Sequence, residues 1–223
     1  MNMKLFFQAL AKLLGGMAAI ALLLFLPAGT YKYPNGLLFC ALLFIPMLFV
    51  GTVLFVKDKQ LLSKRLNSKE KEGTQKVVVL ISAVEFVGCF ISAGFDFRCG
   101  WTHVPKAVVI IAAVLFFCAY LLYAEVMREN AYLSRTVEVQ ENQKVVSTGL
   151  YGIVRHPMYA ATLLLFTMMP IVLGSWVALA FMIPLPFILA KRIHNEEKVL
   201  KTGLDGYEEY MKKVKYRMIP FIW

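Results

Sequence analysis

The sequence is poor in charged residues, and above all in acidic ones. Only 17% of the 223 residues are charged, against roughly a quarter in an average soluble domain. The 24 Lys and Arg outnumber the 14 Asp and Glu, for a net charge of +10, while 59% of the residues are hydrophobic. This composition excludes a disordered or collagen-like chain and argues against a soluble α/β enzyme. It is typical of a membrane protein with basic loops.

Cysteine is also scarce and carries no metal-binding pattern. The four cysteines show no CxxC or Cys/His ligand spacing, and three of them lie in apolar runs. This pattern excludes a disulfide-rich secreted scaffold and predicts no metal site. We also expect no nucleic-acid partner, because the basic residues cluster in the connectors between apolar runs, where they record membrane topology.

Long apolar runs make up much of the chain. A helix needs about 20 apolar residues to cross the hydrocarbon core of a bilayer, and four runs reach about that length: 5–26, 36–56, 77–95 and 107–126. Each run predicts one membrane-spanning helix. Proline within the second run is compatible with this prediction, because membrane helices tolerate it.

The fifth apolar run is too long for one span. Residues 158–190 contain no charged side chain, and as a single helix they would extend about 50 Å, which a bilayer core accepts only with steep tilt. Pro170, Gly174 and Ser175 lie in its middle. We therefore predict a tight helical hairpin that turns near Gly174.

The basic residues agree with the hairpin and orient the chain. With the hairpin in place, 21 of the 24 Lys and Arg lie on one side of the membrane, which the positive-inside rule assigns to the cytoplasm together with both termini. We predict an all-α polytopic membrane protein, in a bacterial cytoplasmic membrane. It has an N-terminal four-span region (1–126) and a second region (127–223) with a cytoplasmic segment, the transmembrane hairpin and a cytoplasmic capping tail.

Acidic residues near the spans have two interpretations. Glu85 lies inside the third run, where an ionisable group is a functional candidate by default. A satisfied interhelical hydrogen bond with a nearby serine, Ser82 or Ser92, is the alternative. Three other acids lie at the ends of spans, where charge costs little: Asp96, Glu125 and Glu129.

The hairpin brings two polar clusters to the same face of the membrane. The first, residues 148–159, places Arg155 and His156 at the start of a helix, where free N–H groups favour an anion. The second, residues 191–197, places Arg192 and Glu196 four apart on one helix face. The two clusters form one site, or they are separate structural features. In the second case the first cluster is an interfacial helix start with basic anchors, and the second is an exposed charged helix.

A short amphipathic helix is predicted near the C-terminus. Its apolar face holds Tyr207, Tyr210, Met211 and Val214, with three lysines close by. This pattern is typical of a helix that lies on an anionic leaflet.

Taken in order, the C-terminal motifs resemble those of the isoprenylcysteine carboxyl methyltransferase family, which is related to phospholipid N-methyltransferases. The resemblance covers about residues 135–223 and rests on a combination of an Arg-His-Pro-x-Tyr stretch, an apolar hairpin and Arg-x-x-x-Glu-Glu. The first four spans match only as generic membrane helices. The matching segments are Val139-Gln140, residues 148–151, residues 155–159, Arg192 with Glu196 and Glu197, residues 206–210, and Ile219-Pro220.

The resemblance implies a cytoplasmic pocket for S-adenosylmethionine, capped by the C-terminal segment, and a lipophilic methyl acceptor held among membrane lipids. Arg192 would face the acceptor, and Arg192 and Glu196 would be catalytic. The cofactor would be bound by residues of the loop before the first cluster and of both clusters: Gln140, Gln143, Lys144, Val145, Val146, Tyr151, His156, Pro157, Met158, Tyr159 and Glu196.

These residue types suit methyl transfer from a sulfonium. His156 at a helix N-terminus suits the carboxylate of the cofactor, Glu196 suits its ammonium or ribose hydroxyls, and the two cluster tyrosines offer faces for adenine or the sulfonium. A carboxylate acceptor needs only a cation to orient it, a role that Arg192 can fill. An amine acceptor must first lose a proton, to Glu196 or Glu197.

Three other functions stay open at this point. An amine or phospholipid N-methyltransferase has the same cofactor and a different acceptor. An NADPH-dependent membrane reductase shares part of the architecture, but the chain shows no added dinucleotide-binding segment. A non-enzymatic membrane transport or assembly factor would use Glu85, and it leaves both polar clusters unexplained.

Overall fold

The computed structural model describes residues 3–67, 73–134 and 139–223. Within these ranges every regular element is a helix, and five helical stretches are long and apolar enough to cross a membrane. A shorter apolar helix pairs with the last of them. The prediction of an all-α polytopic membrane protein is therefore confirmed. The division of the chain at residues 126 and 127 stays a prediction.

The four predicted N-terminal spans are all helices. They are α1 (Met3–Ala28), α2 (Pro34–Lys57), α4 (Gly73–Cys99) and α5 (Lys106–Glu129). Pro34 opens α2 at the first helical position, where its missing N–H costs nothing. A further short helix, α3 (Lys59–Leu66), follows α2 and was not predicted, because its connector shows mainly charge.

The long uncharged run folds back on itself as predicted. Helix α6 (Pro157–Val172) is followed by a turn in which Gly174 has φ of 80°, and then by α7 (Trp176–Ala180) and α8 (Leu185–Gly203). The second limb is broken between α7 and α8. Two prolines, at positions 184 and 186, remove backbone N–H donors there, which explains the break.

Asp96 holds the turn of the hairpin. Its side chain is 1% exposed and accepts hydrogen bonds from the backbone N–H of Thr102, at 2.7 Å, and from the hydroxyls of Thr102 and Ser175. The phenol of Tyr33 donates to the carbonyl of Leu173 beside it. Asp96 lies near the end of α4, as predicted. The expectation that its charge is inexpensive there was wrong, because the carboxylate is buried and depends on donors from Thr102 and Ser175.

Glu85 does not bond to either nearby serine. The hydroxyls of Ser82 and Ser92 both donate to carbonyls of their own helix. Glu85 itself is buried, and neither carboxyl oxygen has a hydrogen-bond partner of normal geometry in the described part of the chain, although the N–H of Leu185 lies nearby. The serine interpretation was wrong, and a functional role for Glu85 stays a prediction.

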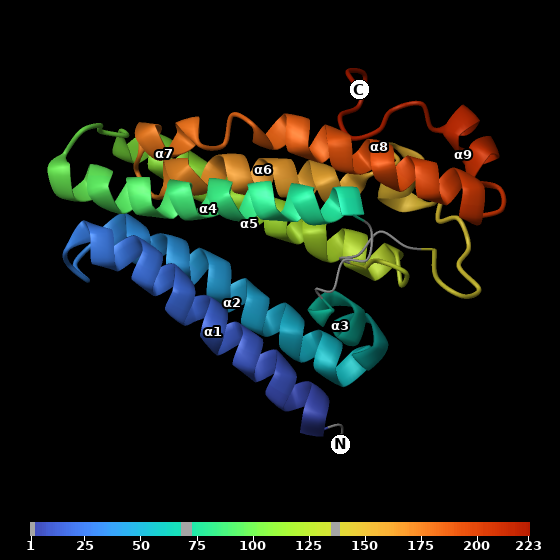
Figure 1. The fold of residues 1–223 in the computed structure, drawn as a ribbon, viewed down its shortest axis with the longest axis horizontal. Helices are drawn as coiled ribbons and strands as arrows, with labels where there is room; N and C mark the ends of the chain where they lie inside the picture. Colours follow the sequence, from blue (N-terminus) through green and yellow to red (C-terminus); the bar gives the residue numbers. More distant parts are fainter. Residues whose placement is uncertain (1–2, 68–72, 135–138) are drawn as a thin grey trace.

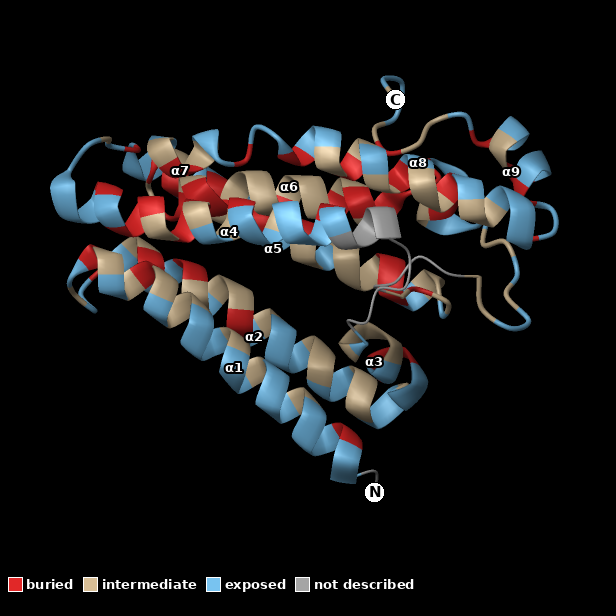
Figure 2. Cartoon of the chain, viewed as in Figure 1, coloured by how far each residue is buried: buried red, intermediate tan, exposed pale blue. Residues whose placement is uncertain are grey.

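The helices form a main bundle with a splayed pair beside it. Figure 1 shows α4, α5, α6 and α8 running roughly parallel, while α1 and α2 diverge from them toward one end. At the opposite end α1 touches α4, where a Cβ on Gly94 would lie 2.5 Å from the carbonyl oxygen of Leu24. Buried residues concentrate in the main bundle (Figure 2), so this bundle is the rigid part of the scaffold.

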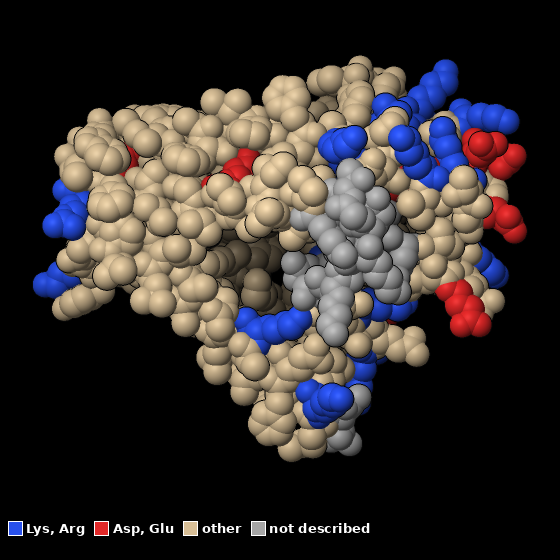
Figure 3. Space-filling view, viewed as in Figure 1, with Lys and Arg blue, Asp and Glu red and all other residues tan. Residues whose placement is uncertain are grey.

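The distribution of charge matches a chain that crosses a bilayer. In Figure 3, Lys and Arg gather mostly at the two ends of the visible face, and the broad surface between them is mostly uncharged, with small acidic patches. The orientation of the chain stays a prediction. A reporter enzyme fused after Trp223 should be active in the cytoplasm, and one inserted at Gly174 should report the opposite side. Signals from the same side at both positions would contradict the hairpin topology.

Candidate active site

A cavity lies at the end of the bundle where α5 ends and α6 begins. The space between its walls is about 850 Å³ when the open mouth is included. Its walls come from residues 130–134, 143–146, 151–159, 192–204 and 207–210. Segments on both sides of the hairpin therefore meet at one site, as predicted. Within the described ranges, no cluster of three His, Cys, Asp or Glu could hold a metal ion.

One wall is the loop that follows α5. Asn130 ends the helix, accepts the N–H of Tyr132 at 2.9 Å and donates its side-chain amide to the phenol of Tyr151 at 2.9 Å. Gln143 accepts the N–H of Gln140 at 2.9 Å, and the amide of Gln140 donates to the carbonyl of Tyr132. Gln140 therefore stabilises the loop without lining the cavity, and Gln143 lines it.

The short 3₁₀ helix Gly149–Gly152 positions Tyr151. Gly149 has φ of 51°, and a Cβ there would lie only 1.5 Å from a carboxylate oxygen of Glu129. That carboxylate accepts the N–H of Leu150 at 3.0 Å. Glu129 at the end of α5 therefore ties the first polar cluster to the bundle, a role that its place in the sequence did not indicate.

Glu197 is the centre of a buried ion cluster. Its carboxylate accepts from Nε of Arg155 at 2.8 Å and from Nε of Arg217 at 3.0 Å, and Nε2 of His156 lies 3.4 Å away. Arg155 also donates to the carbonyls of residues 214–215. The side chains of Arg155 and Glu197 are only 5% and 4% exposed. Removal of either charge would leave the other buried without a counterion, which is strongly destabilising. Arg155 therefore ties the C-terminal segment to the start of α6.

The same cluster corrects one expectation. Arg155 lies at the start of α6 and lines the cavity, with its Nε paired to Glu197. Glu197 does not line the cavity, so it cannot serve there as a base for an amine acceptor. His156 lines the cavity as the N-cap residue of α6, with its Nε2 toward Glu197.

Arg192 and Glu196 meet at the hydroxyl of Tyr159. Nε of Arg192 donates to this oxygen at 2.9 Å, and the hydroxyl donates to Oε2 of Glu196 at 2.6 Å. All three residues line the cavity. Because Tyr159 is on the first turn of α6 and the other two are on α8, only the hairpin brings this chain of hydrogen bonds together.

Helix α9 (Tyr207–Lys213) closes the cavity. Leu204, Tyr207, Tyr210 and Val214 form a buried cluster with partly buried Val145 of the loop. The helix itself was predicted correctly, but the expectation that these side chains face a leaflet was wrong for three of the four residues named. Tyr207, Tyr210 and Val214 are buried against protein because loop 139–145 offers them an apolar surface.

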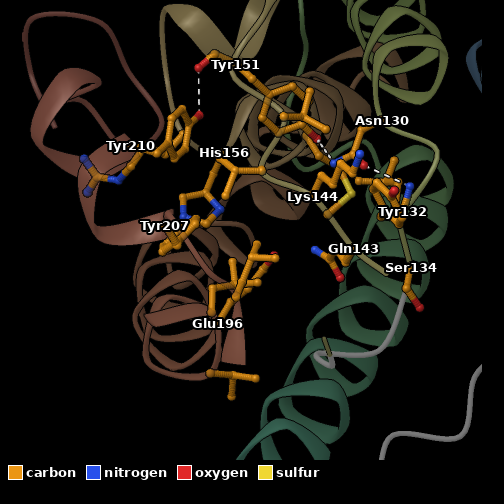
Figure 4. Close-up of a pocket in the computed structure, with 18 of the residues that line it drawn as sticks. Asn130, Tyr132, Ser134, Gln143, Lys144, Tyr151, His156, Glu196, Tyr207 and Tyr210 are labelled. Atoms are coloured by element: carbon orange, nitrogen blue, oxygen red, sulfur yellow. Dashed lines mark hydrogen bonds between the residues drawn. The ribbon is translucent and has the colours of Figure 1, made fainter. Parts of the chain in front are cut away.

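Two tyrosines of the cap face the cavity opposite the loop (Figure 4). The phenol of Tyr210 donates to the carbonyl of Tyr151 at 2.7 Å. The hydroxyl of Tyr207 is buried and has no hydrogen-bond partner in the described part of the chain. Burial raises the pKa of both phenols well above its ordinary value, so both stay protonated and can donate.

Ten of the twelve predicted site residues line the cavity, and Gln140 and Pro157 do not. Pro157 is the first residue of α6 and sets the direction of the helix. The ten are Gln143, Lys144, Val145, Val146, Tyr151, His156, Met158, Tyr159, Arg192 and Glu196. Whether they bind a cofactor or catalyse a reaction stays a prediction.

Sequence reasoning missed part of the lining. Arg155 was noted in the first cluster but not assigned to the site. The other missed residues follow α5 or lie on and after α8: Asn130, Tyr132, Leu133, Ser134, Val199, Leu200, Leu204, Tyr207 and Tyr210. The tyrosines of α9 could have been predicted, because residues 206–210 are one of the segments whose motifs resemble the family. The residues after α5 had none.

Helix α3 also reaches this region, although it lies far away in sequence. Arg65 donates to the carbonyl of Ser134 at 3.2 Å and stacks over the ring of Tyr123, with 5.3 Å to the ring centroid. Leu61 of the same helix packs in a cluster with Tyr151. The N-terminal region therefore buttresses the loop that lines the cavity.

Comparison with known proteins matches one part of the chain to a family. Residues 108–202 match the model of the isoprenylcysteine carboxyl methyltransferase (ICMT) family. This match runs from α5 through the loop, the first polar cluster and the hairpin to the end of the second cluster. A search of curated proteins found no match. Residues 108–202 are therefore similar to the isoprenylcysteine carboxyl methyltransferase (ICMT) family, the family that the C-terminal motifs resemble.

Proposed function

We propose that the protein is an S-adenosylmethionine-dependent methyltransferase that acts on a lipophilic acceptor. The family match and the membrane helices support a membrane methyltransferase. The finer proposal is carboxyl O-methylation of an isoprenylcysteine-type substrate. The observation that carries it is the Arg192–Tyr159–Glu196 chain, because a cation and a carboxylate line one cavity beside the membrane helices.

The donors and surfaces of the cavity fit S-adenosylmethionine. Glu196 can take its ammonium or its ribose hydroxyls, and the buried hydroxyl of Tyr207 supplies a donor that needs an acceptor. Apolar Val145 and Leu200 can cover the adenine. His156, at the N-terminus of α6, suits the carboxylate of the cofactor. When bound, the cofactor supplies the methyl group on a sulfonium.

Arg192 would orient the acceptor. Its planar guanidinium suits a carboxylate, and the hydroxyl of Tyr159 holds its Nε in place. A carboxylate attacks without losing a proton, so the site needs no general base. Alignment of the two reactants and exclusion of water by α9 can then supply much of the acceleration.

Figure 3 shows a hollow between the α1–α2 pair and the main bundle, and we propose that the lipid tail lies there. We propose that an apolar acceptor approaches from the bilayer while a soluble cofactor enters through the open mouth of the cavity.

Binding of the reaction product is the direct test. Purified protein in detergent should bind S-adenosylhomocysteine, and Glu196→Gln should weaken binding roughly 10-fold to 100-fold, because a hydrogen bond to a charged group contributes about 1.5–3 kcal/mol. His156→Ala should also weaken it. Glu208→Gln, an exposed carboxylate of α9, is the matched control and should bind like the unaltered protein. Titration calorimetry measures all four.

The other outcomes identify the alternatives. Binding of NADPH in place of S-adenosylhomocysteine would show a reductase, and binding of neither would favour a non-enzymatic membrane factor. If the cofactor binds, an acceptor screen separates the two methyltransferases. An amine acceptor has structural support in Glu196, a carboxylate that lines the cavity and could take the proton.

A further inference from the structure

Two large apolar side chains protrude from the end of the chain. We call residues 217–223 the C-terminal hook. Phe221 is 87% exposed and Ile222 is 77% exposed. The backbone around them is held firmly, because the carbonyl oxygen of Trp223 accepts N–H groups from Arg217, Met218 and Ile219 at 2.9–3.1 Å. The hook therefore presents these two side chains on a closed loop.

Phe221 adopts a backbone conformation that side chains other than glycine rarely take. Its φ of 65° lies in the left-handed region. This conformation turns the loop back so that the N–H of Trp223 donates to the carbonyl of Ile219 at 3.1 Å. The structure keeps this energetically unfavourable conformation, and it leaves the side chain of Phe221 largely exposed.

The hook lies level with the edge of the uncharged membrane segment. Met218 is buried with Leu189 and Ile193 of α8, and Ile219 and Trp223 pack against the same cluster. The uncharged run ends at residue 190, between Leu189 and Ile193. In Figure 1 the C-terminus projects sideways from α8, across the long axis of the bundle. Its exposed side chains therefore project at the depth where α8 leaves the hydrocarbon core.

The charge around the hook suits the interface of a membrane with anionic lipids. Residues 210–223 contain four basic side chains and no acidic one. The ring of Tyr216 contacts that of Phe221, with 5.4 Å between centroids. Aromatic and basic residues together are typical of segments that enter the headgroup region.

The base of the hook is bonded to the wall of the cavity. Arg217 pairs with Glu197 at 3.0 Å, and its carbonyl accepts the N–H of His156 at 2.7 Å. The neighbouring carbonyl of Tyr216 accepts the N–H of Arg155 at 2.9 Å. An interaction that fixes the position of the hook therefore also fixes the position of Arg155 and His156, which precede α6.

We propose that the C-terminal hook is a membrane wedge. Phe221 and Ile222 insert into the leaflet on the cavity side of the bilayer, and this insertion holds the cavity in its binding conformation through Arg217 and its partners. The insertion stands on the hook alone. The effect on the cavity rests on the proposed function, because its readout is binding of the cofactor product.

Depth measurement tests the insertion. A fluorescent label on Phe221→Cys, with the four native cysteines replaced, is read in vesicles of phosphatidylcholine with one third phosphatidylglycerol. Lipids carrying a nitroxide on the acyl chain should quench this label strongly, and aqueous iodide should quench it weakly. A label on Glu208→Cys of α9 is the control and should show the reverse. Equal quenching of both labels by iodide, or energy transfer between labelled copies that reveals a second chain on the hook, would overturn the wedge.

A second variant tests the coupling with the native cysteines in place. Phe221→Ser with Ile222→Ser should weaken binding of S-adenosylhomocysteine in the same vesicles about 3-fold to 10-fold. Phe221→Trp with Ile222→Leu, which keeps the apolar surface, should restore it. Tyr31→Ser removes another highly exposed aromatic residue, which precedes α2, and should change nothing.

The two experiments separate the possible failures. Unchanged affinity in the serine variant would overturn the coupling. Absence of cofactor binding in the unaltered protein would contradict the proposed function, while the depth measurement would still decide whether the hook inserts.

Discussion

Replacing Glu197 by glutamine should lower the unfolding temperature by roughly 10 °C. The substitution keeps the volume and removes the charge that faces Arg155, His156 and Arg217. A buried guanidinium without its anion costs about 3–5 kcal/mol, and a chain of this size loses about 2–4 °C for each kcal/mol. The same change should weaken cofactor binding, because Arg155 no longer ties the C-terminal segment to the start of α6.

A thiol-reactive dye measures this loss in detergent, with the other three cysteines replaced because Cys99 and Cys118 are exposed. Cys89 is fully buried and then reacts only when the bundle opens. The control is Glu208→Gln, an exposed carboxylate whose removal should change stability by no more than about 0.5 kcal/mol. An unchanged unfolding temperature in Glu197→Gln would contradict the assignment of Glu197 as the centre of a buried ion cluster.

Replacing Arg192 by alanine should abolish most methyl transfer while leaving the cofactor bound. Arg192 is proposed to orient the acceptor, and loss of one oriented donor in a site shielded from water reduces kcat about 10²-fold to 10³-fold. Glu196 and the aromatic lining stay in place, so affinity for S-adenosylhomocysteine should change less than about 3-fold. Radiolabelled methyl transfer to a prenylcysteine analogue gives the first quantity, and calorimetry gives the second.

Two further variants sharpen the test of Arg192. Arg192→Lys keeps the charge without the planar fork and should recover only part of the rate. Lys191→Ala removes an exposed cation one position away and should behave like the unaltered protein. If Arg192→Ala loses affinity for the cofactor product and keeps its kcat at saturating cofactor, Arg192 binds the cofactor and not the acceptor. This result would contradict the proposed role.

Much of the architecture followed from patterns that act locally. Apolar runs of span length predicted α1, α2, α4 and α5, because a bilayer demands length and hydrophobicity from each helix by itself. The hairpin followed from a run too long for one span, with a glycine in its middle. The positions of ten lining residues followed from the resemblance, since those motifs lie in order along the chain.

The errors concern what a side chain faces. Asp96 was taken for a charge at the edge of a span, and it is buried among donors from a neighbouring loop and the hairpin turn. The apolar face of α9 was assigned to a leaflet, and it packs on the loop after α5. An acid near a span end can face water or be buried in protein, and the sequence is the same in both cases. The apolar face of a helix can likewise lie on lipid or on protein, because periodicity identifies the face without identifying what covers it.

The sequence by itself determined the spans, the fold-back at Gly174 and the family that residues 108–202 resemble. The tertiary structure alone decided the roles of two adjacent glutamates. Glu196 faces the cavity and accepts a hydrogen bond from the hydroxyl of Tyr159, while Glu197, the next residue, pairs with Arg155 and Arg217. Neighbours on a helix point about 100° apart, so the packing of α8 against α6 and the C-terminal segment separates their roles.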